Sequence, residues 1–224
     1  MIVKGKLIHA RCCRMTNGFF PATAMPDADW WQVLWPDPGK VLAKMGVQRG
    51  MIVIDLCCGD GLFTAPLAGV ADHVFAVDID PAVLDQARVR LAEAGMTNCE
   101  FIMADAMKLD AVVSEPVDYV LLANTFHGVP DQLGLARVVA TKLKPQGQFG
   151  IVNWHRRSRE ETVVLGQPRG PKTEMRMEAH DVTAIVEAAG LLLNRSIELP
   201  PYHYGVVLGL PVDAVALRQE VKSK

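Results

Sequence analysis

The chain has 224 residues, half of them hydrophobic, and its 23 Lys and Arg against 25 Asp and Glu give a formal net charge of −2. This composition excludes a disordered chain, and the near-neutral charge argues against nucleic acid as a main partner, because phosphate binding needs concentrated positive charge. No apolar run is long enough to span a bilayer and residues 1–14 lack a secretory hydrophobic region, so we expect a cytoplasmic protein without a membrane partner.

The first part of the chain has little regular pattern. Residues 1–25 show weak periodicity and predict an irregular arm, and two short helices are expected over 29–34 and 38–45. Pro38 suits the first turn of the second helix, since its missing N–H costs nothing there.

From Gly50 onward the sequence alternates between strand and helix. The helix over 81–94 is the clearest, because it begins at Pro81, stops before Gly95 and carries an apolar stripe. The first five predicted strands cover 51–56, 73–77, 100–103, 117–123 and 147–154. The remaining predicted helices cover 62–70, 130–143 and 178–189. This alternation predicts a parallel sheet wound by right-handed crossovers.

The last third of the chain is predicted to add a long loop and the final two strands of the sheet. Residues 156–176 are polar and rich in Gly and Pro, and a loop this long is usually a lid or a binding loop. Two strands over 191–199 and 203–210 predict an antiparallel hairpin at one edge, which completes a Rossmann-like α/β fold with seven mostly parallel strands and helices on both faces. An exposed edge near Val206 could pair with a second copy, so we expect a monomer or a homodimer.

A glycine-bearing turn follows the first strand. The sequence there is VIDLCCGDG, in which Asp55 ends the strand and Gly59 and Gly61 permit unusual φ/ψ and close backbone approach to a ligand. Free N–H groups at the next helix start attract an anion. The pattern is DxCxGxG, and the missing GxGxxG argues against a nicotinamide-dependent oxidoreductase.

Three further polar signals follow the next strands. Asp78 lies about twenty residues after the glycine turn, where an acid accepts hydrogen bonds from ribose hydroxyls. Asp105 follows the third strand, and Asn124 and His127 follow the fourth. Open α/β sheets bind their ligands at these carboxyl ends, so the four signals predict one site.

These signals, in this order, resemble the motifs of class I S-adenosylmethionine-dependent methyltransferases, whose first motif is (D/E)xGxGxG. Cys57 replaces the first glycine and leaves less room beside the cofactor. The resemblance implies an enzyme that moves a methyl group from S-adenosylmethionine to a small-molecule acceptor and releases S-adenosylhomocysteine. The cofactor-binding residues that it implies are Asp55, Cys57, Gly59, Gly61, Asp78, Ile79, Asp105, Ala106 and Asn124. Trp30-Trp31, Thr125-Phe126-His127, Asn153-Trp154-His155 and Gly170-Pro171 resemble a subfamily of small bacterial and archaeal methyltransferases.

The resemblance also divides the chain and assigns roles. Residues 1–46 would form an arm and helices covering the cofactor site, and residues 47–224 the S-adenosylmethionine-binding methyltransferase domain. His127 and Asn124 are the catalytic candidates, since the end of the fourth strand faces the methyl group and an imidazole can take a proton; His127 could instead bond only within its own loop. The candidates for acceptor binding are Trp31, His155, Tyr202 and Tyr204, each of which could instead be a packing residue.

The acceptor itself stays open. The acceptor could be a thiol, selenol or metalloid, since soft nucleophiles such as a thiolate or selenolate need little further help, whereas a hydroxyl or amine is expected to use a base such as His127. A Cys12–Cys13 thiolate pair could bind a metalloid, although adjacent strand residues point to opposite faces. No CxxC or HExxH spacing occurs, so we expect no metal site. A non-catalytic S-adenosylmethionine binder and, less well supported, a nicotinamide enzyme remain alternatives.

Overall fold

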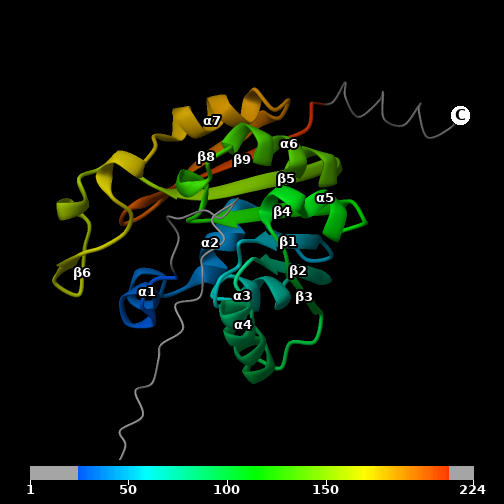
Figure 1. Cartoon of the computed structure of the whole chain (residues 1–224), viewed down its shortest axis with the longest axis horizontal. Coiled ribbons are helices and arrows are strands. Elements are labelled where there is room, and N and C mark those ends of the chain that lie inside the picture. Colours follow the sequence, from blue (N-terminus) through cyan, green and yellow to red (C-terminus); the bar gives the residue numbers. More distant parts are fainter. Residues whose placement is uncertain (1–24, 212–224) are drawn as a thin grey trace, which may run out of the picture.

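The computed structural model describes residues 25–211, which form a seven-stranded sheet covered by helices on both faces (Figure 1). The strands are β1 (Ile52–Leu56), β2 (His73–Asp78), β3 (Cys99–Met103), β4 (Val117–Ala123), β5 (Leu143–Trp154), β8 (Leu192–Leu199) and β9 (His203–Gly209). The helices are α1 (Ala28–Leu34), α2 (Pro38–Met45), α3 (Thr64–Ala68), α4 (Pro81–Glu93), α5 (Leu109–Val112), α6 (Gln132–Lys142) and α7 (Ala179–Glu187). Residues 1–24 of the predicted arm over 1–25, with the Cys12–Cys13 pair, lie outside the described residues.

The strand order confirms the predicted Rossmann-like fold. The order is β3-β2-β1-β4-β5-β9-β8; β1 to β5 are parallel, and β9 runs antiparallel to both β5 and β8. One apolar core joins the sheet to α5, α6 and α7, and a second joins it to α1, α2, α3 and α4. Among residues 25–211, no helix combines the length and hydropathy needed to cross a bilayer.

Local sequence explains where the helices start. Asp80 caps α4 by accepting a hydrogen bond from the Ala82 N–H at 2.9 Å, and Pro81 occupies the first turn. Asp37 caps α2 in the same way through the Lys40 N–H, and Gly46 ends that helix with φ of 85°. The strong helix signals of the sequence therefore match the observed bounds closely.

Weaker signals gave less accurate bounds. The fifth strand begins at Leu143 instead of 147, because its first residue pairs with Val117 across an irregular register and α6 ends at Lys142. Helix α3 covers only Thr64–Ala68. The 3₁₀ turn and short helix α5 after β3 were not expected from the sequence.

The position of β9 corrects one prediction. Val206 is fully buried and pairs with Ile151 on one side and Ser196 on the other, so it does not lie at an exposed edge. Strand β8 forms that edge instead. The hairpin itself is as predicted, but the argument for dimer pairing at Val206 is wrong.

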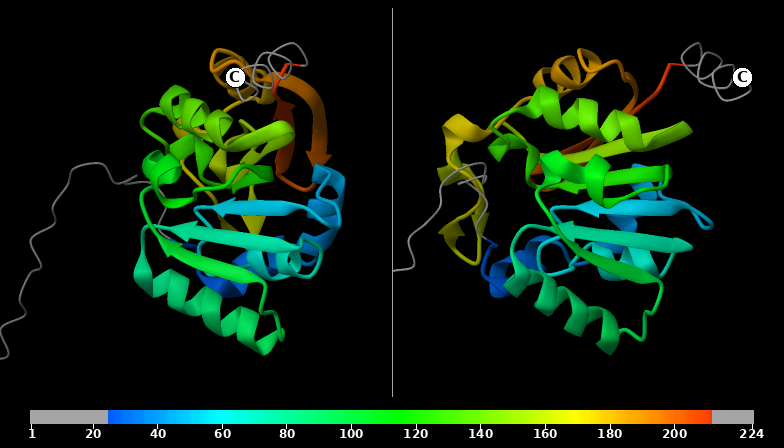
Figure 2. Two further views of the ribbon diagram at one scale, coloured as in Figure 1. Left: turned by 90° about the vertical axis from the view of Figure 1, so that its right-hand side faces the viewer. Right: turned by 45° about the vertical axis from the view of Figure 1, so that its right-hand side comes forward.

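The segment between β5 and α7 folds onto the parallel strands' carboxyl side. It contains the short hairpin β6 (Val163–Val164) and β7 (Gln167–Pro168), and β6 contacts α1. Figure 2 shows α1 in blue and this segment in yellow beyond the arrowheads of the parallel strands. Two segments far apart in the sequence therefore face the same end of the sheet.

Candidate active site

A cavity of about 700 Å³ opens at the carboxyl ends of β1 to β4. Ten of the residues singled out from the sequence line it: Trp31, Asp55, Cys57, Gly59, Asp78, Ile79, Asp105, Ala106, Asn124 and His127. They come from five separate segments of the chain, which the sheet topology brings to one place.

The glycine turn after β1 has a left-handed backbone at three positions. The φ angles are 59° at Cys57, 56° at Gly59 and 81° at Gly61. A Cβ at Gly61 would lie 2.9 Å from the Cβ of Ala87, so this glycine lets the turn pack against α4. Gly61 therefore does not line the cavity as the sequence implied; it supports the turn from behind.

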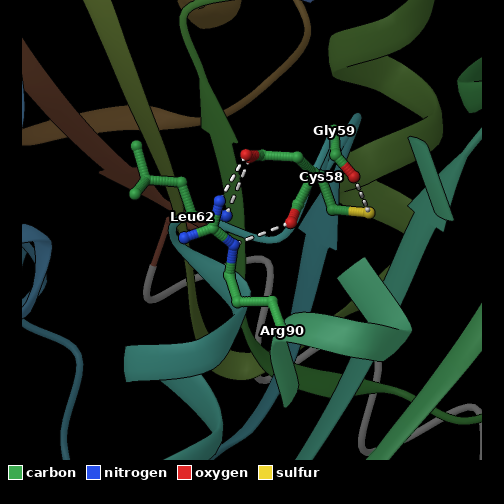
Figure 3. A network of polar contacts seen from close by, with 5 residues as sticks. Cys58, Gly59, Leu62 and Arg90 are labelled. Carbon is green, nitrogen blue, oxygen red and sulfur yellow. Dashed lines mark hydrogen bonds and ion pairs between the residues drawn. The ribbon is translucent and has the colours of Figure 1, made fainter. Parts of the chain in front are cut away.

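A partly buried ion pair holds the same turn. Arg90 of α4 bonds the Asp60 carboxylate through Nη2 at 2.5 Å and the Asp60 carbonyl oxygen through Nε at 2.9 Å. Figure 3 shows the Arg90 side chain reaching from its helix to the segment around Gly59. The Asp60 side chain is only 9% exposed, so it is not a plain surface residue, and its charge is matched within the fold.

Asp78 links the end of β2 to the glycine turn. One carboxylate oxygen accepts from the Gly59 N–H at 2.9 Å and the other from the Asp80 N–H at 3.0 Å. Each oxygen can accept a further bond, so Asp78 orders the cavity wall and keeps acceptor capacity for a ligand.

Asp55 is a buried carboxyl at the end of β1. It is 1% exposed and accepts a hydrogen bond from the Thr64 hydroxyl at 2.6 Å. Burial raises the pKa of Asp55 to about 7, opposed by the Thr64 bond and reinforced by the charges of Asp78 and Asp60. A positively charged ligand bound nearby would therefore favour the ionised form of the Asp55 carboxyl.

Asn124 lines the cavity, and its side chain carries buried polar atoms without partners among the described residues. Its φ is 61°, its N–H donates to Val152 O at 2.8 Å, and both polar atoms of its side chain are buried. Within residues 25–211, neither side-chain atom has a hydrogen-bond partner. Because buried polar groups are nearly always paired, these atoms fit a ligand that supplies the partner.

His127 is oriented by Asn153. The Nδ1 atom lies 3.0 Å from Asn153 Oδ1, which also accepts from the Trp154 N–H, so Nδ1 carries the proton and Nε2 keeps a lone pair. Burial lowers the pKa of His127, the Asn153 bond opposes this shift, and Arg176 adds to it. The imidazole is therefore neutral at pH 7 and able to accept a proton at Nε2.

Indole rings and two arginines complete the cavity. Trp30, Trp31 and Trp154 line it, and so do Arg159 and Arg169 from the segment after β5. The sequence pattern does not point to the two arginines, because an irregular segment has no period from which side-chain direction can be inferred. The signal that existed was the concentration of arginine between 156 and 176.

Three predicted acceptor-binding residues lie outside the cavity, contrary to the sequence prediction. His155 Nε2 pairs with Glu198 at 2.9 Å, the Tyr202 hydroxyl donates to Val163 O, and the Tyr204 hydroxyl donates to Met177 O. Their polar atoms contact β8, the β6–β7 hairpin and the segment before α7. The alternative reading of these residues, as packing residues, fits their contacts better.

Comparisons with known proteins agree with this geometry. Residues 53–147 match the family described as methyltransferase domain. Demethylmenaquinone methyltransferases of Listeria monocytogenes serotype 4a (strain HCC23) and Lactococcus lactis subsp. lactis (strain IL1403) are 32% and 30% identical over 117 and 112 residues. Those matches cover 51% and 49% of this chain and 49% and 44% of the relatives, so the chain spans about half the length of the curated relatives it matches.

Solved structures match over more of the chain. A SAM dependent methyltransferase from Aquifex aeolicus has a TM-score of 0.67 at 25% identity, covering 79% of this chain and 91% of that one. N-methyltransferase NodS from Bradyrhizobium japonicum WM9, in complex with S-adenosyl-L-homocysteine, has a TM-score of 0.65 at 13% identity, covering 83% and 93%. Residues 53–147 therefore match a methyltransferase domain, on a fold shared with the solved S-adenosylmethionine-dependent methyltransferase from Aquifex aeolicus.

Proposed function

We propose that this chain transfers the methyl group of S-adenosylmethionine to a small-molecule acceptor with a protonated hydroxyl or amine, and releases S-adenosylhomocysteine. The observation that carries the proposal is the pairing, in one cavity, of the strand-end carboxylates with a neutral histidine whose Nε2 is free to accept a proton. The unpartnered side chain of Asn124 lies in the same cavity.

The residues present fit the cofactor. The left-handed turn at Gly59 would hold its amino-acid tail, the carboxylate of Asp78 its ribose hydroxyls, and Asp105 its adenine amino group. Ile79 and Ala106 would flank the adenine ring. We further assign residues 1–46 to an arm and helices that cover this site and 47–224 to the methyltransferase domain; the cavity contacts of Trp30 and Trp31 support this division.

Charge supports the same assignment. The cofactor carries a sulfonium and an ammonium group, and the cavity contains several carboxyl side chains on its β1 to β3 side. The pKa of Asp55, raised to about 7 by burial, would fall when a cation binds nearby, because an opposite charge favours the ionised form. Cofactor binding would therefore release a fraction of a proton near neutral pH.

The protein's own contribution to the reaction is alignment and proton removal. When bound, S-adenosylmethionine supplies a methyl group on a good, neutral leaving group. The indole rings that line the cavity would shield bound ligands from water, which favours the aligned acceptor over hydrolysis. His127 accepts the acceptor's proton at Nε2, and Asn153 keeps the ring in the required tautomer through Nδ1.

The proposed hydroxyl or amine acceptor follows from the presence of a general base, His127. The curated relatives are named demethylmenaquinone methyltransferases, which is compatible with a cyclic organic acceptor, but they share only half their length with this chain. A thiolate, selenolate or metalloid acceptor already presents a strong nucleophile and would have less need of His127. In the described part of the chain no three His, Cys, Asp or Glu side chains are grouped to hold a metal ion, and burial raises the pKa of the Cys57 and Cys58 thiols.

The test is an acceptor screen that measures S-adenosylhomocysteine, run with the wild type, His127→Gln and, as a control, His180→Gln on the exposed surface of α7. We expect turnover with phenols or amines, a loss of kcat of about 100-fold or more in His127→Gln, and cofactor affinity within twofold of the wild type. The fall in kcat at acidic pH that we expect for the wild type should be absent in His127→Gln.

Equal turnover in His127→Gln would remove this residue from the reaction. Turnover with thiols alone would replace the proposed acceptor class. Cofactor binding without turnover on any acceptor would favour the non-catalytic binder.

A further inference from the structure

Two arginine side chains on the cavity wall have no carboxylate partner. Arg159 and Arg169 both line the cavity, and within residues 25–211 neither lies within ion-pair distance of an Asp or Glu. Residues 1–24 contain no Asp or Glu. Among the described residues, the two guanidinium groups therefore line the cavity with unmatched charge.

Arg169 is oriented by an aromatic ring instead of an acid. Its guanidinium carbon lies 5.3 Å from the centre of the Trp30 ring, and its Nε atom is buried with no hydrogen-bond partner among the described residues. Arg159 donates one bond, from Nε to Gly170 O at 3.1 Å. Because guanidinium groups present a planar fork of donors, most of this donor capacity remains available to a ligand.

The fold holds both arginines in place at a cost. Arg176 is 3% exposed and donates to the carbonyl oxygens of Pro171 and Arg169 and to the Thr162 hydroxyl. Its guanidinium also lies 5.1 Å from the Trp154 ring. A buried cation near the charge of Arg159 opposes stability, so this arrangement is better explained by ligand binding than by folding.

Most carboxyl groups of the cavity and its two arginines come from different elements, and a further carboxyl, that of Asp27, lies at the start of α1. The carboxyl groups of Asp55, Asp78 and Asp105 come from the ends of β1, β2 and β3, whereas the two arginines come from the segment after β5. A cationic cofactor suits the acidic side. The basic side, which includes Trp30 and Trp154, suits a planar molecule that carries a negative charge.

We infer that Arg159 and Arg169 form an anion subsite that binds a carboxylate of the methyl acceptor, with Trp30 and Trp154 flanking its ring. The inference rests on the proposed methyl transfer, since it names the acceptor class of the same cavity. The acceptor is then an aromatic acid, such as a hydroxybenzoate or hydroxycinnamate, and not a neutral phenol. The alternative source of the same charge is the cofactor's own carboxylate.

The experiment measures binding to the full chain saturated with S-adenosylhomocysteine. Benzoate, 4-hydroxybenzoate and cinnamate are titrated beside their primary amides, which keep the shape and remove the charge. The variants are Arg169→Gln alone, whose side chain makes no described hydrogen bond, and Arg159→Gln/Arg169→Gln. The matched control is Arg156→Gln/Arg157→Gln, two exposed arginines of the same segment that do not line the cavity.

We expect the wild type to bind the acids at least tenfold more tightly than the amides. In Arg159→Gln/Arg169→Gln the two affinities should differ by less than twofold. In the control Arg156→Gln/Arg157→Gln the tenfold preference should remain. Equal binding of acids and amides, or a preference that survives Arg159→Gln/Arg169→Gln, would overturn the inference.

A second arm separates the two sources of the anion. S-adenosylhomocysteine carries a carboxylate, and 5′-methylthioadenosine does not. If the double variant binds S-adenosylhomocysteine at least tenfold more weakly than the wild type but binds 5′-methylthioadenosine with unchanged affinity, the arginines bind the cofactor's carboxylate. That result would overturn the inference. A wild-type chain that binds neither nucleoside would instead contradict the proposed function itself.

Discussion

At the scale of single residues, backbone strain gathers around the cavity. Of the three non-glycine residues with positive φ in the described chain, Cys57 and Asn124 line the cavity, with φ of 59° and 61°. A left-handed conformation costs such residues about 1–2 kcal/mol, and strain of this kind concentrates at functional sites. The geometry at Cys57 also explains why related motifs have glycine at this place.

The carboxylate of Asp78 gives the clearest residue-scale prediction. Asp78→Ala removes the acceptor of the Gly59 and Asp80 N–H groups together with the proposed ribose contact, so we expect S-adenosylhomocysteine to bind at least tenfold more weakly by calorimetry. Asp72→Ala, on the exposed surface, is the control. Affinity within twofold of the wild type in Asp78→Ala would count against the ribose assignment.

The sequence could predict this row of acids but not the rest of the cavity. Asp55, Asp78 and Asp105 each follow a recognisable buried strand, so their common position follows from parallel topology. Arg159 and Arg169 come from a segment whose path depends on tertiary contacts. Their position could therefore be known only from the folded chain.

At the scale of elements, the glycine turn and α4 form one unit. The Arg90–Asp60 pair and the close approach of Gly61 to Ala87 fix the helix against the turn. We expect Gly61→Ala to lower the free energy of unfolding by about 2–4 kcal/mol, since a Cβ there adds a clash to an unfavourable φ of 81°. Urea unfolding measures this loss.

Gly95→Ala is the matched control, because Gly95 also has positive φ but a Cβ there would meet nothing within 4 Å. It should cost about 1–2 kcal/mol, from strain alone. Equal losses in the two variants would show that the contact with α4 contributes nothing.

The buried guanidinium of Arg176 links three residues of the segment between β5 and α7. Arg176→Met keeps an unbranched apolar chain but removes the bonds to Thr162, Arg169 and Pro171. We expect amide hydrogen exchange to speed up at least tenfold over residues 159–171 while the strands of the sheet keep their protection. Arg137→Met, on the exposed side of α6, should leave both regions unchanged; unchanged exchange in Arg176→Met would contradict the role given to this residue.

The accuracy of the element predictions followed the strength of the local signals. Helix α4 has a cap, a proline and an apolar stripe, and its predicted bounds were nearly correct. The start of β5 lies at a proline-containing run where helix passes directly into strand, so no turn residue marks it. The burial of β9 between two strands depends on pairing order, which local pattern does not encode.

At the scale of the whole molecule, two buried titratable groups change the folding stability in opposite directions as pH changes. Burial lowers the pKa of His203 well below its usual value; the ring lies between Trp35 and Trp154. Burial raises the pKa of Asp55 to about 7. His203 therefore contributes stability that is lost as pH falls below about 6.5, whereas Asp55 contributes stability that is lost as pH rises from about 4 to 7.

Two variants separate these effects in urea unfolding between pH 5 and pH 8. His203→Phe should gain stability relative to the wild type as pH falls, by at most about 1.4 kcal/mol per pH unit. Asp55→Asn should gain relative to the wild type as pH rises, with its largest advantage at pH 8. Parallel stability curves for wild type and both variants would show that neither group titrates as its burial requires.

The most direct test of the account is a crystal structure of the full chain with S-adenosylhomocysteine. We expect the ribose hydroxyls within hydrogen-bond distance of the Asp78 carboxylate, the amino-acid tail on the turn at Gly59, and the sulfur facing the space between Asn124 and His127. Nucleoside density at any other place, or none at saturating concentration, would contradict the central claim.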